Sequence, residues 1–156
     1  MRTLFSKTVQ QIMSENENVF FLTADLGYPF LNGIREKFND RFINVGAAEQ
    51  SLFDIAVGLA LSKKYPICYT ITPFILRGLE TLRTYVDHEI IPMLIVGSGR
   101  NKEYLRDGIS HWATDTDLIF NGFDNIRYVE PLLYNIERDL YDIIASNIPT
   151  IITLNK

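Results

Sequence analysis

One acidic side chain in this sequence, that of Glu49, stands where it could act on a bound ligand. It follows a β-branched and aromatic run at residues 42–45 that predicts a short buried strand, and Gly46 ends that strand. Helical spacing resumes from Ala47, which puts Glu49 in the first turn of a helix. Ligands of open α/β sheets bind at the carboxyl ends of the strands, where such a helix begins. A carboxyl group at this place can share or transfer a proton with a bound ligand.

The sequence around Glu49 also supports a purely structural role. An acidic residue in a first helical turn is stabilised by the helix dipole, by about 0.3–1 kcal/mol. The helix that Glu49 opens is expected to bury one apolar face, made of Ala48, Leu52, Ile55 and Leu59. The local sequence leaves both roles of Glu49 open.

Further polar candidates lie in and after a long loop at residues 98–114. The loop contains Asp107 and His111, and Asp115 follows it directly. Loops of this length are usually functional or disordered. A loop histidine is ordinarily solvated or hydrogen-bonded locally, and Asp115 would serve as an N-cap for the short helix expected at 115–120. The loop is therefore a candidate site whose role the residue types alone do not assign.

The elements that must position these residues alternate along the chain. Strands are expected at residues 19–24, 42–45, 66–70, 93–97, 126–129 and 150–154. Helices are expected at residues 3–15, 34–38, from 47 onward, 74–86, 115–120 and 132–145. Because the strands are continuous apolar runs, we expect an α/β fold of three αβα layers around a mostly parallel sheet. The length predicts a single domain over residues 1–156.

The composition is that of an ordinary globular protein. Of the 156 residues, 47% are hydrophobic and 22% are charged. A net charge of -4 offers no basic surface for nucleic acid, and no apolar run approaches the ~20 residues of a membrane span. The single cysteine, Cys68, lies in an apolar run and is expected to be a small buried hydrophobe. A cytoplasmic location is the default expectation.

Several stretches together resemble the transketolase family, which includes the deoxyxylulose-phosphate synthases. The sequence NVGAAEQSLFDIAVGLAL at residues 44–61 is similar to the family's NVGIAEQ…GIAAGLAL. Residues 69–83, YTITPFILRGLETLR, are similar to YTFATFLLRAFEQIR, and the stretch 96–115 with DGISH is similar to a family stretch with DGPTH. Residues 23–26 match the family's strand-end ADL. These stretches cover roughly two-thirds of the chain in the family's order, which is far more specific than any single motif.

The resemblance implies a domain that binds the aminopyrimidine ring of thiamine diphosphate. Glu49 matches the family's glutamate, whose carboxyl group binds ring nitrogen N1′ and so promotes the cofactor's reaction at C2 of its thiazolium ring. Phe74 matches a phenylalanine that stacks on the pyrimidine, although without the resemblance it would pass for a core residue. Pro73 departs from the family, which has a small polar residue there. Arg77 is assigned to the same cofactor site and is expected to pair with Glu80 or across a subunit boundary.

The resemblance also implies a sugar substrate. The family's DGPTH places an aspartate and a histidine on sugar hydroxyl groups, so Asp107 and His111 are expected to orient a sugar or sugar phosphate, with His111 acting in catalysis. Asp115 stands where the family has an acidic residue, and Trp112 replaces the family's glutamine, which suggests a different substrate shape. By the same analogy Asp25 lines the cofactor cleft, and otherwise it is a turn residue.

One expected part of a thiamine enzyme is missing from the sequence. The family holds the diphosphate and its Mg²⁺ through a GDG motif in a separate domain, and no GDG occurs here. We therefore expect no metal ligands in this chain, and a partner subunit that binds the diphosphate and Mg²⁺. The cofactor would lie at the interface, in a heterotetramer that contains a homodimer of this chain.

Alternatives to a transketolase subunit remain open from the sequence. The chain could belong to another thiamine enzyme, either a deoxyxylulose-phosphate-type synthase or a 2-oxo acid decarboxylase or dehydrogenase. It could be a non-catalytic regulatory subunit that keeps the fold. It could also be an unrelated flavodoxin-like or receiver-like module, but a receiver needs clustered acidic residues after its first strand and only Asp25 is there.

Overall fold

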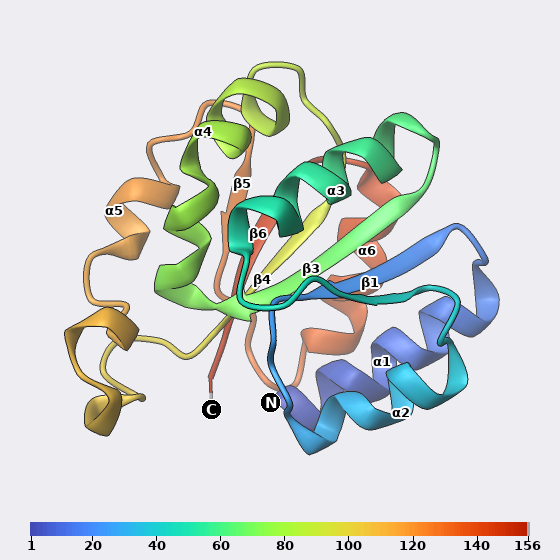
Figure 1. Cartoon of the computed structure of the whole chain (residues 1–156), viewed down its shortest axis with the longest axis horizontal. Coiled ribbons are helices and arrows are strands. Elements are labelled where there is room, and N and C mark those ends of the chain that lie inside the picture. Colours follow the sequence, from blue (N-terminus) through green and yellow to red (C-terminus); the bar gives the residue numbers. More distant parts are fainter. Residues whose placement is uncertain (156) are drawn as a thin grey trace.

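Six parallel strands form the centre of the computed structural model, which describes residues 1–155 (Figure 1). Their order across the sheet is β2-β1-β3-β4-β6-β5. The strands are β1 (Val19–Thr23), β2 (Phe42–Asn44), β3 (Tyr65–Ile71), β4 (Leu94–Ser98), β5 (Arg127–Val129) and β6 (Thr150–Leu154). The two outer strands, β2 and β5, are only three residues long each.

Helices cover both faces of the sheet, as expected for three αβα layers. The α-helices are α1 (Arg2–Glu15), α2 (Asn32–Lys37), α3 (Glu49–Leu61), α4 (Leu79–Thr81), α5 (Thr116–Phe120) and α6 (Ile136–Ser146). One apolar core lies between the sheet and helices α1, α2 and α6, where Phe5 and Leu140 are fully buried. A second core lies between the sheet and helices α3 and α5, where Phe53 and Phe120 are buried. The predicted fold class is confirmed, and every strand pairing is parallel.

Two predicted helices differ from the structure by more than two residues at a boundary. The expected helix at 74–86 is divided into a 3₁₀ turn (Thr72–Gly78), the short α4 and a π turn (Leu82–Asp87). The helix expected at 132–145 begins only at Ile136. Leu132 and Leu133 precede it and lie on the surface, at 50% and 54% exposure. The apolar spacing of these two leucines made the predicted helix longer than the observed one.

Helix α3 buries a different face from the predicted one. Its buried residues are Glu49, Leu52, Phe53, Ala56 and Val57, whereas Ile55 is 40% exposed. Because Phe53 is larger and lies one position from Leu52, the helix turns so that both enter the core. That rotation also turns Glu49 inward, although Glu49 is not part of the predicted apolar face.

Buried thiol and hydroxyl groups make the stability of this fold sensitive to alkali. Burial raises the pKa of the Cys68 thiol and of the Tyr65 and Tyr69 hydroxyls above their ordinary values. These groups stay protonated in the folded chain, while the unfolded chain releases their protons from about pH 8.5 for cysteine and pH 10 for tyrosine. Stability is therefore complete below those values and falls as the pH rises through them, by up to about 1.4 kcal/mol per pH unit for each group.

We expect urea unfolding between pH 7 and 11 to show this decline starting near pH 9. In Cys68→Ala the decline should start about one pH unit higher, because the remaining buried groups with a raised pKa are tyrosines. An unfolding free energy that stays constant up to pH 11 would contradict the linkage.

None of the helices within residues 1–155 has the length and apolar character that a membrane crossing needs.

Candidate active site

The candidate site forms at the carboxyl ends of β1, β2, β3 and β4. Asn44 ends β2, and its side-chain oxygen accepts hydrogen bonds from the backbone N–H groups of Gly46 (3.0 Å) and Asp25 (2.9 Å). These bonds join the turn after β2 to the turn after β1. Gly46 has a φ of 76°, in the left-handed region that glycine adopts without steric cost, and so redirects the chain into α3. The helix begins at Glu49 and not at Ala47, and Glu49 lies in its first turn, as predicted.

The Glu49 side chain is buried and paired. The residue is only 4% exposed, and its Oε2 lies 2.8 Å from Nη1 of Arg77. Arg77 belongs to the 3₁₀ turn that follows β3, so the pair joins the segments that leave β2 and β3, the two strands on either side of β1. Of the two pairings expected for Arg77, with Glu80 or across a subunit boundary, the first is wrong, because the guanidinium turns toward the buried Glu49 carboxylate instead.

An aromatic ring lies beside this ion pair. The guanidinium carbon of Arg77 is 3.9 Å from the centre of the Phe74 ring. Phe74 also contacts His111, whose ring centre is 4.9 Å away in an edge-to-face arrangement. Glu49, Arg77, Phe74 and His111 thus form a continuous group, although they come from three separate parts of the chain.

The loop that carries His111 is held in place by a tyrosine that sequence reasoning missed. Tyr104 is 7% exposed, and its hydroxyl lies 2.8 Å from Ser98 Oγ and 3.0 Å from the hydroxyl of Tyr28. Arg2 donates a hydrogen bond to the same hydroxyl over 3.1 Å. The rings of Tyr104 and His111 are 6.1 Å apart, so this network anchors the loop next to the histidine. Apart from Ser98, the partners of Tyr104 are distant from it in sequence, and no spacing pattern links them.

The loop is further closed by its own backbone. Asn101 and Ala113 form an antiparallel bridge in which the N–H of Ala113 donates to the carbonyl of Asn101 over 2.7 Å. The segment at 98–114 is therefore a folded loop with two 3₁₀ turns, Leu105–Asp107 and Ile109–His111.

The other predicted site residues lie on the surface around this group. Asp25 is exposed and has a φ of 48°, in the left-handed region, directly after β1. Asp107 is exposed at the end of the first 3₁₀ turn of the loop. Asp115 is exposed and occupies the N-cap position of α5, but its side chain makes no capping hydrogen bond. Within residues 1–155, no group of three or more His, Cys, Asp or Glu side chains is placed to hold a metal ion.

The position of Arg77 shows what kind of ligand this arrangement fits. Its guanidinium is a flat group that presents an N–H to the Glu49 carboxylate and a face to the Phe74 ring. A planar nitrogen heterocycle offers the same two features, a hydrogen-bonding edge and a flat face. The Arg77 side chain is 52% exposed and can leave toward solvent. Glu49 and Phe74 therefore offer a hydrogen-bonding group and an aromatic face that a planar heterocycle could use in place of this guanidinium.

Comparison with known proteins gives the arrangement a family. Residues 1–156 match the sequence profile described as "Transketolase, pyrimidine binding domain". The chain belongs to the transketolase pyrimidine-binding domain family. The resemblance read from the sequence is thereby confirmed.

Curated relatives agree with this assignment, and a solved structure shares the fold. An apulose-4-phosphate transketolase subunit from Actinobacillus succinogenes is 32% identical over 108 residues, which cover 69% of this chain and 35% of that protein. A 1-deoxy-D-xylulose-5-phosphate synthase from Corynebacterium glutamicum is 34% identical over 110 residues, covering 70% of this chain and 17% of the synthase. A solved structure described as "Split gene transketolase, inactive beta4 tetramer" superposes with a TM-score of 0.83 at 24% identity, over 99% of this chain and 50% of that one. This transketolase pyrimidine-binding domain thus spans about a third of the first of these relatives and less of the second.

Proposed function

We propose that this pyrimidine-binding domain is a subunit of a thiamine diphosphate-dependent transketolase, which moves a two-carbon ketol unit between sugars or sugar phosphates. The observation that carries the proposal is the buried Glu49 carboxylate beside the Phe74 ring, at the carboxyl edge of a parallel sheet. The family's fold would receive the pyrimidine ring at this end of the strands. The Glu49 carboxyl group suits the hydrogen-bonding edge of the ring, and the Phe74 side chain suits its flat face.

Each residue of the group has a distinct proposed role. Glu49 binds N1′ of the pyrimidine and shares a proton with it, which burial favours because water competes poorly for the carboxyl group. Phe74 stacks on the ring. Arg77 moves from between these two side chains toward the rim of the site and contacts the bound cofactor from there, while Asp25 lines the cleft. When bound, thiamine diphosphate supplies the carbon nucleophile that the sugar's carbonyl group needs.

The loop at 98–114 is proposed to hold the sugar. His111 touches Phe74 and is only partly buried, so a ligand that stacks on Phe74 would bring its reacting end near the imidazole. Asp107 in this loop and Asp115 directly after it are exposed and can accept hydrogen bonds from sugar hydroxyl groups. Together these three side chains would orient the substrate and stabilise charge on its oxygen atoms.

A partner subunit is proposed to complete the site. The similar proteins include one named as a transketolase subunit and one described as a split gene transketolase, and this chain covers only part of each. We infer that a second polypeptide binds the diphosphate and Mg²⁺, and that a homodimer of this chain sits within a heterotetramer.

The test is to measure cofactor binding by calorimetry with and without the partner, taken as the subunit with a GDG motif that co-purifies with this chain. The mixture should bind thiamine diphosphate with Mg²⁺ at least about tenfold more tightly than the chain alone, because the charged diphosphate has its ligands on the partner. Thiamine without the diphosphate should bind both samples weakly. Tight, Mg²⁺-dependent binding by the chain alone would overturn the shared site.

A second candidate function is a deoxyxylulose-phosphate-type synthase, which the 34% identity to such an enzyme favours. The two functions differ in the donor, a ketose for the transketolase and a 2-oxo acid for the synthase. Product analysis of the reconstituted enzyme with each donor separates them. Transfer from a ketose phosphate without release of carbon dioxide supports the transketolase.

A further inference from the structure

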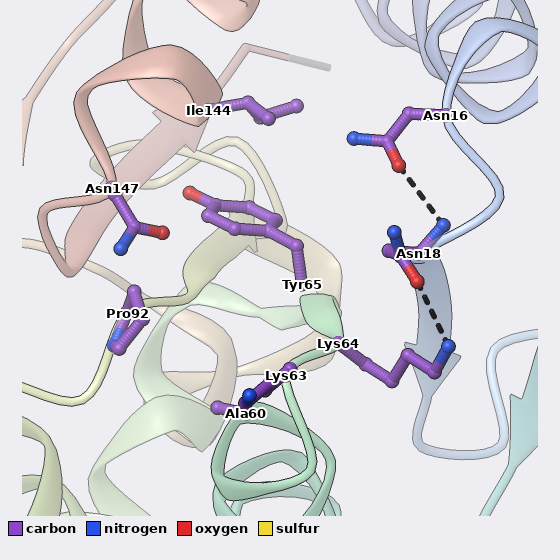
Figure 2. A pocket seen from close by; sticks show the side chains of 9 residues that line it. All are labelled: Asn16, Asn18, Ala60, Lys63, Lys64, Tyr65, Pro92, Ile144 and Asn147. Atoms are coloured by element: carbon purple, nitrogen blue, oxygen red, sulfur yellow. Dashed lines mark hydrogen bonds between the residues drawn. The ribbon is translucent and has the colours of Figure 1, made fainter.

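The two ends of the sheet differ in what their polar side chains do. At the amino ends of β1 and β3 lies a pocket of about 400 Å³, drawn in Figure 2, between the C-terminal ends of α1, α3 and α6. The carbonyl groups at those helix ends disfavour an anion, and Lys64 at this pocket donates a hydrogen bond to Asn18 Oδ1 over 2.8 Å. At the carboxyl ends of the strands, a hydrogen-bonded group centred on Tyr104 lies next to the candidate active site.

Tyr104 is the buried point of a mostly exposed stretch. Among residues 101–110 it is the only buried residue, at 7% exposure. Its ring packs against the backbone of Gly99, where an added Cβ atom would lie 2.7 Å from Cδ2 of the tyrosine. Gly99 also has a φ of 89°, in the left-handed region that favours glycine. The turn after β4 is therefore shaped to receive this ring, which fixes the loop from its inner side.

The Tyr104 hydroxyl joins the loop to three other segments. It lies 2.8 Å from Oγ of Ser98, the last residue of β4, and 3.0 Å from the hydroxyl of Tyr28, which follows β1. It also accepts a hydrogen bond from Nη1 of Arg2, the first residue of α1, over 3.1 Å. A phenol hydroxyl can donate one hydrogen bond and accept two, so these three partners match its capacity. Loss of the hydroxyl would deprive each of these largely buried groups of a partner.

Two short turns connect this anchor to His111. The N–H of Asp107 donates to the carbonyl of Tyr104 in the first 3₁₀ turn, and the N–H of His111 donates to the carbonyl of Gly108 in the second, each over 3.0 Å. The ring centre of His111 is 6.1 Å from that of Tyr104 and 4.9 Å from that of Phe74. A displacement of Tyr104 would therefore move His111 relative to Phe74.

We propose that Tyr104 is a positioning residue, which holds His111 in place for the sugar before the substrate arrives. The proposal rests on the proposed function of the loop. Because the anchoring groups belong to the chain itself, the substrate does not have to order the loop when it binds. Groups that orient a substrate tolerate little misplacement, and about 1 Å can cost about 10²-fold in rate. Loss of the hydroxyl should affect the sugar and not the cofactor, because Glu49 lies on α3, outside the loop.

The first test measures amide hydrogen exchange by NMR in the ¹⁵N-labelled full chain. In Tyr104→Phe the amides of Asp107 and His111, both hydrogen-bonded within the loop, should exchange at least about fivefold faster, while those of α3 keep their rates. Ser98→Ala removes one partner of the hydroxyl, leaves the Tyr104 ring in place, and should give a smaller increase in the same amides. Tyr134→Phe is the matched control, because it removes a hydroxyl from a residue that is 81% exposed, and it should change neither rate.

The second test is steady-state ketol transfer by the enzyme reconstituted with its partner. Tyr104→Phe should lower kcat/KM for the ketose by about 10–100-fold, and should change the dissociation constant of thiamine diphosphate less than about twofold. In a His111→Ala background the same substitution should cost less than about twofold, because a positioning residue has little further effect once the group that it positions is gone.

The outcomes separate this proposal from the function on which it rests. Unchanged exchange in both Tyr104→Phe and Ser98→Ala would overturn the positioning role, and so would equal losses of kcat/KM from Tyr104→Phe with and without His111. Full activity of His111→Ala, together with faster exchange in Tyr104→Phe, would instead refute the proposed role of His111 itself.

Discussion

Glu49→Gln is expected to lower the kcat of the reconstituted enzyme by about 10²–10⁴-fold. Glutamine keeps the size of the side chain, and its amide oxygen can still accept a hydrogen bond from Arg77, which now lies 2.8 Å from the Glu49 carboxylate. It cannot share a proton with N1′ of the pyrimidine. Turnover should therefore fall far more than cofactor binding does. The measurement is steady-state ketol transfer together with calorimetric binding of thiamine diphosphate.

Glu80→Gln provides the matched control for this variant. Glu80 is an exposed glutamate three residues beyond Arg77, and its substitution removes the same charge from the same region. It should change kcat less than about twofold, as surface substitutions usually do. Full activity of Glu49→Gln in an intact complex would disprove the proposed role and favour a regulatory subunit. Equal losses of kcat in both variants would mean that the negative charge of the region, and not Glu49 in particular, supports turnover.

Gly78→Ala is expected to destabilise the chain by about 1–3 kcal/mol and to impair the site at the same time. Gly78 ends the 3₁₀ turn that carries Phe74 and Arg77, and it packs directly on α3. A Cβ atom at this position would lie 2.2 Å from Cδ2 of Phe53, a fully buried ring with no space to move into. The turn would have to shift away from α3, which separates Phe74 and Arg77 from Glu49. Thermal unfolding should show a melting temperature lower by about 2–4 °C per kcal/mol.

Gly58→Ala tests the same exchange where there is space. Gly58 lies on the exposed side of α3, and nothing lies within 4 Å of an added Cβ. In a helix interior this substitution should stabilise the chain by about 0.5–1 kcal/mol. Opposite signs of the stability change in the two alanine variants would show that the close packing at Gly78, and not the loss of a glycine itself, determines the change. Similar melting temperatures for both variants would refute the predicted clash.

The sheet was predictable from sequence because its strands are continuous apolar runs. β6 lies at the predicted residues, and β1 differs from the prediction by one residue. Each of these strands is buried on both faces, so apolar character alone defines it. Helix boundaries were predicted less accurately than strand boundaries, because they depend on how each helix packs against the rest of the fold. The segment after β3 reads as one helix in sequence, yet it is divided into three helical types where Gly78 meets Phe53.

The candidate site was only partly predictable. Glu49 and Phe74 followed from the resemblance, and the structure brings them to either side of one guanidinium. The partner of Arg77 could not be predicted, because Glu80 is nearer in sequence and only the rotation of α3 turns Glu49 toward it. The anchoring of the loop by Tyr104 was missed for a similar reason. Its partners are six to 102 residues away, and no short-range pattern reports such contacts.

The shortness of the outer strands limits how this protein can assemble. β2 and β5 offer only three residues each at the two margins of the sheet, too few to template a strand from another polypeptide. Any contact with another chain would therefore be made through side chains of helices and loops and not through a shared main-chain ladder. Contacts of that kind can separate without unfolding either chain, so copies of this protein could change neighbours while each keeps its own sheet intact.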